Sequence, residues 1–232
     1  MIKLLLCDTF PGLLPEYIPS YAWMFTRLFD SVSAQPGDYE VYPAMEGIFP
    51  PLHPCDDIHL ITGCNLSVYD DVDWIRALLH WIRRADQLQL KVVGICFGHQ
   101  AVAQALGGQV RRATVGWGTG IRESQVSGEA LHYFPDGHMR LFYNHHDQVT
   151  HLPPAATRIA TSAFCPNEAF TVGNHIITFQ GHPEYLPSYA VHLLMNFADD
   201  EPIAVRQAAL RSIGLHQHQG DTVARWILQR YK

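Results

Sequence analysis

The chain has 232 residues, of which 47% are hydrophobic and 16% are charged, and its formal net charge is −6. A chain of this length can bury the core of one α/β domain. The negative charge disfavours nucleic acid and anionic membranes as partners, and no apolar run approaches the roughly 18 residues that a membrane span needs.

The cysteines show no C-x-x-C spacing and their number is odd: Cys7, Cys55, Cys64, Cys96 and Cys165. A disulfide framework in a secreted chain uses an even number of cysteines at regular spacings. The first apolar run is also too short for the core of a signal peptide. We therefore expect reduced thiols and a cytoplasmic protein.

Strands and helices alternate in the first half of the chain. Short buried strands are expected at residues 2–7, 39–42, 58–62 and 90–95. Apolar residues at helical spacing predict helices in residues 21–29, 74–88 and 97–106. In the second of these helices the buried stripe is expected to be Trp74, Leu78, Trp81, Ala85 and Leu88. This alternation predicts a doubly wound, mostly parallel sheet flanked by helices.

The second half of the chain has a different pattern. Short strands with turns are expected at residues 121–126, 139–143, 158–162, 169–172 and 175–179, as an antiparallel addition to the sheet. A helical tail follows over about residues 187–232. Because no repeat or linker interrupts the chain, we expect a single domain over residues 1–232.

The segment 94–100, Gly-Ile-Cys-Phe-Gly-His-Gln, joins an expected strand to an expected helix. A G-x-C-x-G sequence at such a junction is typical of a nucleophile elbow in which cysteine takes the place of serine. The glycines permit a sharp turn, and the free N–H groups at the start of the helix favour the reactive thiolate. Cys96 is thus a candidate nucleophile, the alternative being a small buried thiol of structural use.

A second motif, His182-Pro183-Glu184, follows the last expected strand. Pro183 biases His182 toward an extended backbone, in which residues two apart face the same side. A carboxylate beside an imidazole orients it as a base for a nucleophile. The alternative is an exposed turn with a structural ion pair, and only the fold can bring this pair to Cys96.

The two motifs together resemble the class I glutamine amidotransferases, which carry a G-x-C-x-G-x-Q elbow and a later H-P-E. The resemblance runs from the first strand through Glu184 and weakens in the helical tail. It implies a flavodoxin-like α/β fold with Cys96 as nucleophile, His182 as general acid/base and Glu184 as its orienting partner. It implies neither a metal ion nor an organic cofactor.

The same resemblance implies where an oxyanion and a substrate would bind. The oxyanion hole would use the backbone N–H of Phe97 and one from the loop at Gly63 and Cys64. Gln100 would hold the γ-glutamyl portion of the substrate.

The segment 144–149 resembles a strand edge that binds substrate in this family, with His146 and Asp147 as the expected contacts. Solvent-facing polar residues are the alternative for this segment. A metal site is a further alternative for His145, His146 and Asp147, but the histidines of the chain show no metal-binding spacing. His216 and His218 are expected at the surface.

Two departures from the family pattern concern the site. The loop after the third strand reads Gly63-Cys64-Asn65, where paired glycines and a proline are usual. Gly181 stands where a bulky residue usually precedes the histidine, as in the free-standing γ-glutamyl peptidase-like branch. We expect Gly181 to open room near His182 for a substrate larger than glutamine.

The expected reaction is cysteine-dependent hydrolysis of a γ-glutamyl amide bond, in glutamine or in another small γ-glutamyl compound, through a thioester. Two alternatives stay open: a glutaminase subunit that supplies ammonia to a separate synthetase, and a catalytically silent regulatory module on the same scaffold. The chain has no G-x-x-x-x-G-K-[ST] loop for ATP, so a synthetase would be a separate subunit. The sequence does not identify the leaving group.

Overall fold

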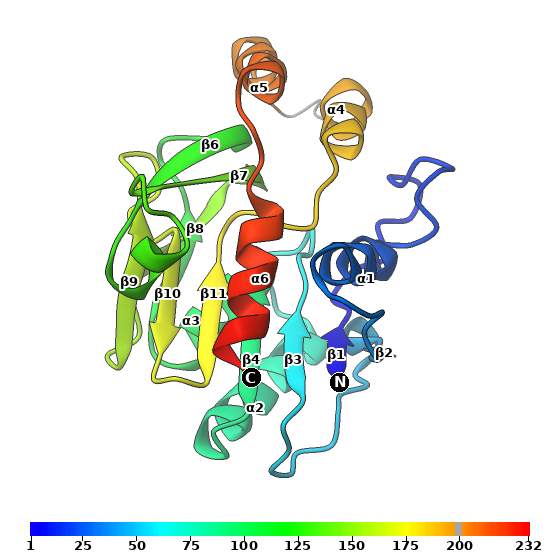
Figure 1. Ribbon diagram of the computed structural model, residues 1–232, viewed down its shortest axis with the longest axis vertical. Helices are drawn as coiled ribbons and strands as arrows, with labels where there is room; N and C mark the ends of the chain where they lie inside the picture. Colours follow the sequence, from blue (N-terminus) through cyan, green and yellow to red (C-terminus); the bar gives the residue numbers. More distant parts are fainter. Residues whose placement is uncertain (198–200) are drawn as a thin grey trace.

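The computed structural model describes residues 1–197 and 201–232. A nine-stranded sheet forms its centre, in the order β2-β1-β3-β4-β11-β10-β9-β6-β7 (Figure 1). The parallel strands are β2 (Tyr39–Tyr42), β1 (Ile2–Leu5), β3 (Ile58–Ile61), β4 (Lys91–Ile95) and β11 (Ile176–Phe179). The antiparallel strands are β10 (Ala169–Val172), β9 (Ala156–Thr161), β6 (Gly118–Val126) and β7 (His138–His145). The predicted parallel sheet with an antiparallel addition is confirmed.

Helices cover both faces of this sheet (Figure 1). On one face α1 (Tyr21–Val32) packs against α6 (Gly220–Arg230), and on the other α2 (Asp73–Gln87) packs against α3 (Phe97–Ala105). Two further helices, α4 (Pro187–Asn196) and α5 (Ile203–Leu215), lie beyond the carboxyl ends of the parallel strands. The predicted helical tail is confirmed, and its first two helices lie at the end of the sheet where α/β proteins place their sites.

The sequence did not predict a second, two-stranded sheet formed by β5 (Gln109–Arg112) and β8 (Asp147–His151). Two 3-10 helices also occur, η1 (Ala44–Glu46) and η2 (Gly128–His132). β8 follows β7 after a single residue, His146, so that Asp147 begins a strand in a different sheet. The segment 144–149 therefore leaves the nine-stranded sheet and enters the two-stranded sheet within a few residues.

The helices follow from local sequence. In α1 the Ser20 hydroxyl caps the first turn by accepting from the N–H of Trp23 at 3.1 Å, as N-cap serines do. In α2 the predicted stripe is partly wrong, because Trp74 and Leu88 are only half-buried. The buried residues there are Ile75, Leu78, Trp81, Ile82 and Ala85. Trp74 still packs against the core, with its ring centroid 5.6 Å from that of Phe97 at the start of α3.

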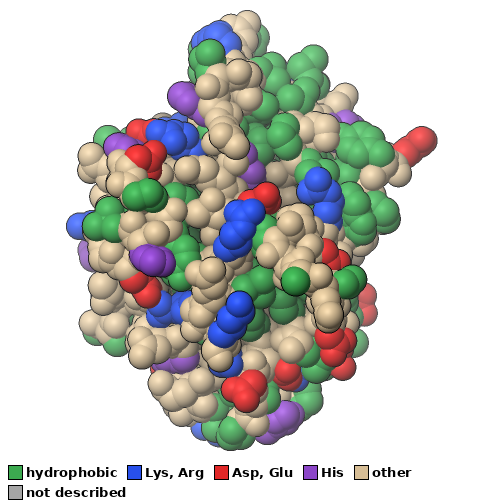
Figure 2. Space-filling view, viewed as in Figure 1, with side chains coloured by type: hydrophobic (Ala, Val, Ile, Leu, Met, Phe, Trp, Pro, Cys, Tyr) green, Lys and Arg blue, Asp and Glu red, His purple; other side chains and the backbone are tan. Residues whose placement is uncertain are grey.

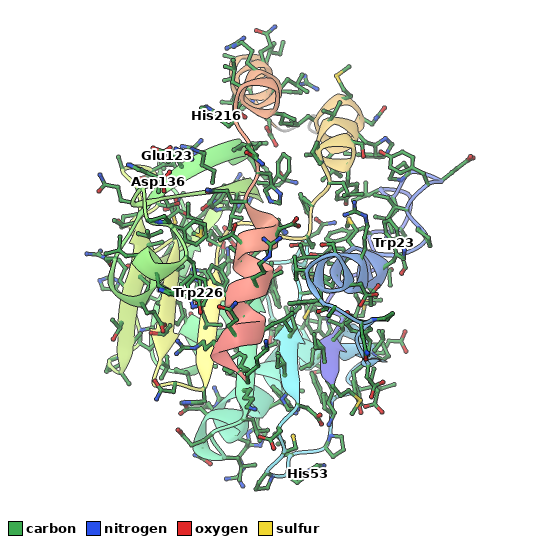
Figure 3. All side chains as sticks on the ribbon, viewed as in Figure 1. Trp23, His53, Glu123, Asp136, His216 and Trp226 are labelled. Atoms are coloured by element: carbon green, nitrogen blue, oxygen red, sulfur yellow. The ribbon has the colours of Figure 1, made fainter. Side chains whose placement is uncertain are left out.

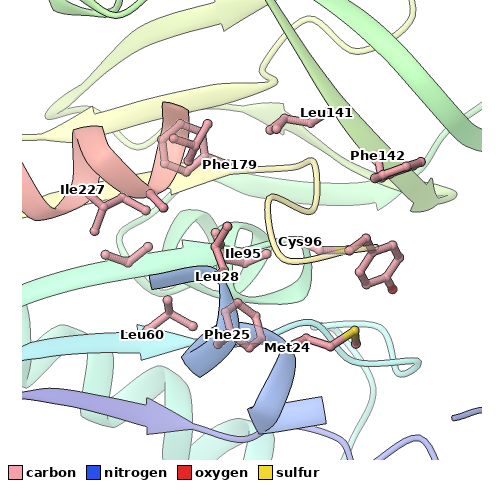
Figure 4. Packing of buried hydrophobic residues seen from close by; sticks show 14 of the residues in the cluster. Met24, Phe25, Leu28, Leu60, Ile95, Cys96, Leu141, Phe142, Phe179 and Ile227 are labelled. Carbon is pink, nitrogen blue, oxygen red and sulfur yellow. The ribbon is translucent and has the colours of Figure 1, made fainter. Parts of the chain in front are cut away.

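Two apolar clusters fill the space between the sheet and its helices. Figure 4 shows the cluster on the α1 and α6 side, where Leu28, Leu60, Ile95 and Ile227 approach one another. Cys96 lies at the edge of this cluster, directly after Ile95 (Figure 4). The nucleophile candidate is therefore attached to a strand that is itself packed into the core.

Acidic and basic side chains are scattered among one another on the face shown in Figure 2. Within residues 1–197 and 201–232, no helix has the length and apolar character needed to cross a membrane.

Candidate active site

Cys96 lies at the turn between β4 and α3 in a strained backbone conformation, with φ 51° and ψ −102°. A residue with a β-carbon rarely adopts positive φ, and such strain often marks a functional position. Cys96 itself adopts the positive φ of the turn, whereas Gly94 and Gly98 do not. These two glycines instead allow backbone atoms to pack closely around them. A β-carbon on Gly94 would lie 2.6 Å from the Gly98 carbonyl oxygen, and one on Gly98 would collide with the Ile61 carbonyl.

His182 and Glu184 form the predicted pair after β11. The imidazole Nδ1 lies 2.7 Å from Oε1 of Glu184, and both residues are 2% exposed. Because a carboxylate only accepts, Nδ1–H donates and Nε2 is left free. The His182 N–H donates to the Phe142 carbonyl at 2.7 Å, and the ring stacks on Tyr185 with centroids 4.0 Å apart. The imidazole is thereby fixed on several sides.

Cys96 and His182 approach each other next to Gly63. A β-carbon on Gly63 would lie 3.1 Å from Cε1 of His182 and 3.8 Å from Cβ of Cys96. These three residues follow β3, β4 and β11, which are adjacent parallel strands. The sheet order thus brings together motifs that are far apart in the sequence.

The charges around His182 favour its protonated form. Burial alone would lower the pKa of His182, but the negative charges of Glu184 and of Cys96 outweigh burial and raise the pKa to about 10. An imidazole in this setting can accept a proton and later donate it to a leaving group.

Tyr21 on α1 is a site residue that the sequence did not reveal. Its hydroxyl donates to Oε1 of Glu184 at 2.9 Å and accepts from the N–H of Gly63 at 3.2 Å. Tyr21 thus links the carboxylate to the loop after β3. The N–H of Gly63 already has an acceptor, unlike the free donor that an oxyanion hole needs.

Gln180 is a second residue that the sequence did not single out. Its amide nitrogen lies 3.6 Å from Sγ of Cys96, and its Oε1 accepts from Nε2 of Gln100 at 3.1 Å. Gln100 also donates to the Asp147 carbonyl at 3.0 Å. A hydrogen-bonded chain therefore runs from β8 to the sulfur.

His218 is half-buried, whereas the sequence predicted a surface position. Its Nε2 is 3.0 Å from the His182 carbonyl oxygen, and its ring packs on Phe142 with centroids 4.5 Å apart. Since a carbonyl only accepts, Nε2–H donates and holds the His182 backbone from behind. His216, by contrast, is exposed at the C-terminal end of α5, as predicted (Figure 3).

His146 and Asp147 lie together at the end of β7 and the start of β8. Nδ1 of His146 is 3.0 Å from Oδ1 of Asp147, which also accepts from Tyr69 at 3.0 Å. Oδ2 accepts from Ser67 at 2.6 Å. Both carboxylate oxygens of Asp147 are therefore occupied by neighbours. The ring of His146 packs against Trp117, with centroids 4.5 Å apart.

A cavity of about 190 Å³ opens over these side chains. Its lining includes Cys96, His182, Gln100, Cys64, His146 and Asp147. Phe97, the first residue of α3, stands directly after Cys96, and the first N–H groups of a helix have no acceptor within it. Among the residues that the structure describes, no three His, Cys, Asp or Glu side chains are grouped to hold a metal ion.

Gly181 does not open the room that the sequence led us to expect. A β-carbon there would lie 2.7 Å from Cβ of Leu141 and 3.0 Å from Cζ of Tyr143. The space is filled by side chains of β7. Gly181 thus allows β7 to pack closely behind His182.

Comparison with known proteins decides the family. The family model for glutamine amidotransferase class-I matches residues 55–200. The chain belongs to this family. It is a glutamine amidotransferase-like hydrolase, and gamma-glutamyl peptidase 3 of Arabidopsis thaliana is 32% identical to it over 180 residues, which cover 73% of this chain and 72% of that protein.

Solved structures show that the chain has the fold of this family. A glutamine amidotransferase of Thermotoga maritima superposes with a TM-score of 0.72 at 17% identity, covering 99% of this chain and 95% of that one. One from Methylobacillus flagellatus gives a TM-score of 0.69 at 20% identity, covering 99% and 92%. The predicted family and fold class are thus confirmed.

Proposed function

We propose that this amidotransferase-like enzyme hydrolyses the γ-glutamyl amide bond of a small γ-glutamyl compound, with Cys96 as the nucleophile. The observation that carries the proposal is the strained Cys96 at the cavity, beside a buried imidazole that is paired with Glu184. The 32% identity to a protein named gamma-glutamyl peptidase 3 supports the choice of bond.

In the first half of the reaction His182 takes the thiol proton, and the Cys96 thiolate attacks the γ-carbonyl carbon of the substrate. The carbon–nitrogen bond then breaks as His182 returns the proton to the departing nitrogen. The product is a γ-glutamyl thioester on Cys96 and a free amine. Glu184 orients the imidazole and stabilises its positive charge throughout.

In the second half His182 removes a proton from water, and the resulting hydroxide attacks the thioester carbonyl. The carbon–sulfur bond breaks, releasing a carboxylic acid, and the sulfur leaves as the thiolate beside protonated His182. The cycle consumes one water molecule per amide bond and requires no oxidant or reductant.

The oxyanion of each tetrahedral intermediate needs preorganised N–H donors. We assign this role to the backbone N–H groups of Phe97 and Cys64. Gly63 does not donate to the oxyanion itself, because its N–H donates to the hydroxyl of Tyr21. The hydrogen bond from the Gly63 N–H to the Tyr21 hydroxyl holds the loop in place for Cys64.

The wall formed by Gln100, His146 and Asp147 would hold the γ-glutamyl portion. Gln100 and His146 face the cavity, while Asp147 keeps His146, Ser67 and Tyr69 in position through its carboxylate. Asp147 therefore contributes through the groups that it orients.

The test is a substrate panel on the purified chain: glutamine, γ-glutamyl dipeptides and γ-glutamyl anilides, with ammonia and amine release measured separately. We expect amine release from γ-glutamyl amides by the isolated chain, abolished in Cys96→Ala and retained in Cys55→Ala. Cys55 is a matched control because it lies outside the cavity lining.

Two results would reject this proposal in favour of the alternatives. Rapid glutamine turnover that starts only when a synthetase is added would indicate an ammonia-supplying subunit. No turnover of any γ-glutamyl compound and no acylation of Cys96 would indicate a catalytically silent module.

A further inference from the structure

Asp8 is a carboxylate that the proposed reaction does not use. It lies beyond the carboxyl end of β1 and accepts one backbone hydrogen bond with each oxygen. Oδ1 accepts from the N–H of Phe10 at 2.7 Å, and Oδ2 accepts from the N–H of Asn65 at 3.2 Å. Phe10 and Asn65 both line the cavity, whereas Asp8 lies behind them. One carboxylate thus joins the segment after β1 to the loop after β3.

The bond to Asn65 follows from the order of the strands. β1 and β3 are parallel neighbours, so their carboxyl ends lie side by side. The N–H of Cys7 donates to the Thr62 hydroxyl at 3.0 Å, which joins the two segments one residue before Asp8. A proline is usual in the family where Asn65 stands, and proline has no N–H to donate. The bond to Asp8 therefore depends on a departure of this chain from the family pattern.

The loop after β3 carries three consecutive N–H groups, those of Gly63, Cys64 and Asn65. The first donates to the Tyr21 hydroxyl at 3.2 Å and the third to Asp8. The N–H of Cys64, between them, has no acceptor among the residues that the structure describes. A free donor whose neighbours on both sides are held is preorganised for an oxyanion.

Asp8 also fixes a strained residue of the cavity wall. Phe10 has φ 50°, in the left-handed region that a residue with a β-carbon rarely adopts. An aspartate that accepts from the N–H two residues on stabilises such a turn. The ring of Phe10 is 5% exposed and packs edge-on against Tyr21, with centroids 4.6 Å apart. Tyr21, which accepts from the Gly63 N–H, is thus supported from this side as well.

We propose that Asp8 is a positioning residue for the oxyanion hole, which keeps the Cys64 N–H available by holding Asn65 and Phe10. This inference rests on the proposed function, because it takes Cys64 as an oxyanion donor. Asp8 acts as an acceptor for two N–H groups and does not contact the reacting atoms. Its negative charge is not the useful property, since like charges repel and the intermediate is an oxyanion.

The experiment measures two properties of Asp8→Ala. The first is kcat for a γ-glutamyl anilide, whose hydrolysis passes through an oxyanion. The second is the rate at which iodoacetamide alkylates Cys96, followed by mass spectrometry, because this reaction forms no oxyanion. Asp8→Ala should lower kcat by about 10- to 100-fold, less than the loss of an oxyanion donor outright, with KM less affected and the alkylation rate within about twofold of the wild type. Asp38→Ala, at an exposed position before β2, should keep both wild-type values.

Asp8→Asn separates the hydrogen bonds from the charge. The amide keeps one acceptor oxygen and loses the charge, so its kcat should lie between those of the wild type and of Asp8→Ala. If Asp8→Ala does not fold, Asp8→Asn decides by the same two measurements.

Equal kcat values for the wild type and Asp8→Ala would overturn this inference. A kcat and an alkylation rate that fall together would also overturn it, because they would show a general loss of the site. An Asp8→Asn enzyme at least as fast as the wild type would show that the second acceptor oxygen is not needed. A wild type that cleaves no γ-glutamyl compound would instead reject the proposed function, and this inference with it.

Discussion

The hydroxyl of Tyr21 donates a 2.9 Å hydrogen bond to Oε1 of Glu184, the same oxygen that accepts from His182. Tyr21 is 1% exposed and also accepts from the N–H of Gly63. One side chain of α1 therefore joins the carboxylate of the His182 pair to the loop proposed for the oxyanion hole.

Replacing Tyr21 by Phe should lower kcat by about 10- to 100-fold, because a hydrogen bond to a buried charged group contributes about 1.5–3 kcal/mol. The measurement is steady-state hydrolysis of a γ-glutamyl anilide. Tyr17→Phe is the matched control, since Tyr17 is 54% exposed. Equal kcat values for the two variants would show that Tyr21 does not position Glu184.

His218→Ala should lower kcat more than His216→Ala. The first change removes the donor to the His182 carbonyl and the packing on Phe142, whereas the second removes an exposed ring. We expect a loss of roughly tenfold in kcat, as for one hydrogen bond, with KM little changed. His218→Gln restores a donor without the ring, so partial rescue of kcat by this variant would show that the hydrogen bond matters apart from the packing. Full activity of His218→Ala would show that His218 does not position His182.

Gly181→Ala should destabilise the folded state by about 1–3 kcal/mol, because its β-carbon would overlap Leu141 and Tyr143. Gly214→Ala on α5 has open space around its β-carbon and should stabilise by up to about 1 kcal/mol through helix propensity. Urea unfolding of both variants checks the pair. A neutral Gly181→Ala would mean that β7 can move away from the site.

Acid should destabilise the protein through buried histidines. Burial lowers the pKa of His59 to about 4, of His99 to about 3 and of His145 to about 4. Their folded pKa values lie below the ordinary value near 6.5, so the stability present above that pH is lost as the pH falls from about 6.5 toward 4. Each contributes up to about 1.4 kcal/mol per pH unit in this window.

Urea unfolding at several pH values measures the slope of the unfolding free energy against pH. His59→Asn should reduce this slope by the amount for one proton, about 1.4 kcal/mol per pH unit. A slope that His59→Asn leaves unchanged would contradict the assignment. His182 behaves in the opposite sense: its pKa is raised to about 10, so its contribution to stability is complete below about pH 6.5 and is lost as the pH rises through 10.

Local motifs in the sequence predicted the part of the site that depends on neighbouring residues. Cys96 lies at a strand-to-helix turn because its flanking glycines permit close packing, and His182 and Glu184 share a side because Pro183 favours an extended backbone. The alternating pattern of strands and helices predicted the parallel sheet for the same reason: each element carries its own periodicity.

Residues that act across the fold had no such signal. Tyr21, Gln180 and His218 reach the site from separate segments, and their partners are tens of residues or more away in the sequence. An aromatic on an apolar helix or a histidine in a polar stretch looks the same whether or not it reaches the site. The interpretation of Gly181 was wrong for a related reason, since only the fold shows that Leu141 and Tyr143 fill its space. The single domain and the cytoplasmic location stay predictions.

The measurement that tests the central claim most directly is mass spectrometry of the chain after reaction with a glutamine-mimicking diazoketone. We predict one label per chain, on the sulfur of Cys96, and none on Cys64. Cys64 lines the same cavity, but burial raises the pKa of its thiol to about 12. A labelled Cys64, or a chain that hydrolyses γ-glutamyl amides with Cys96 replaced by Ala, would contradict it.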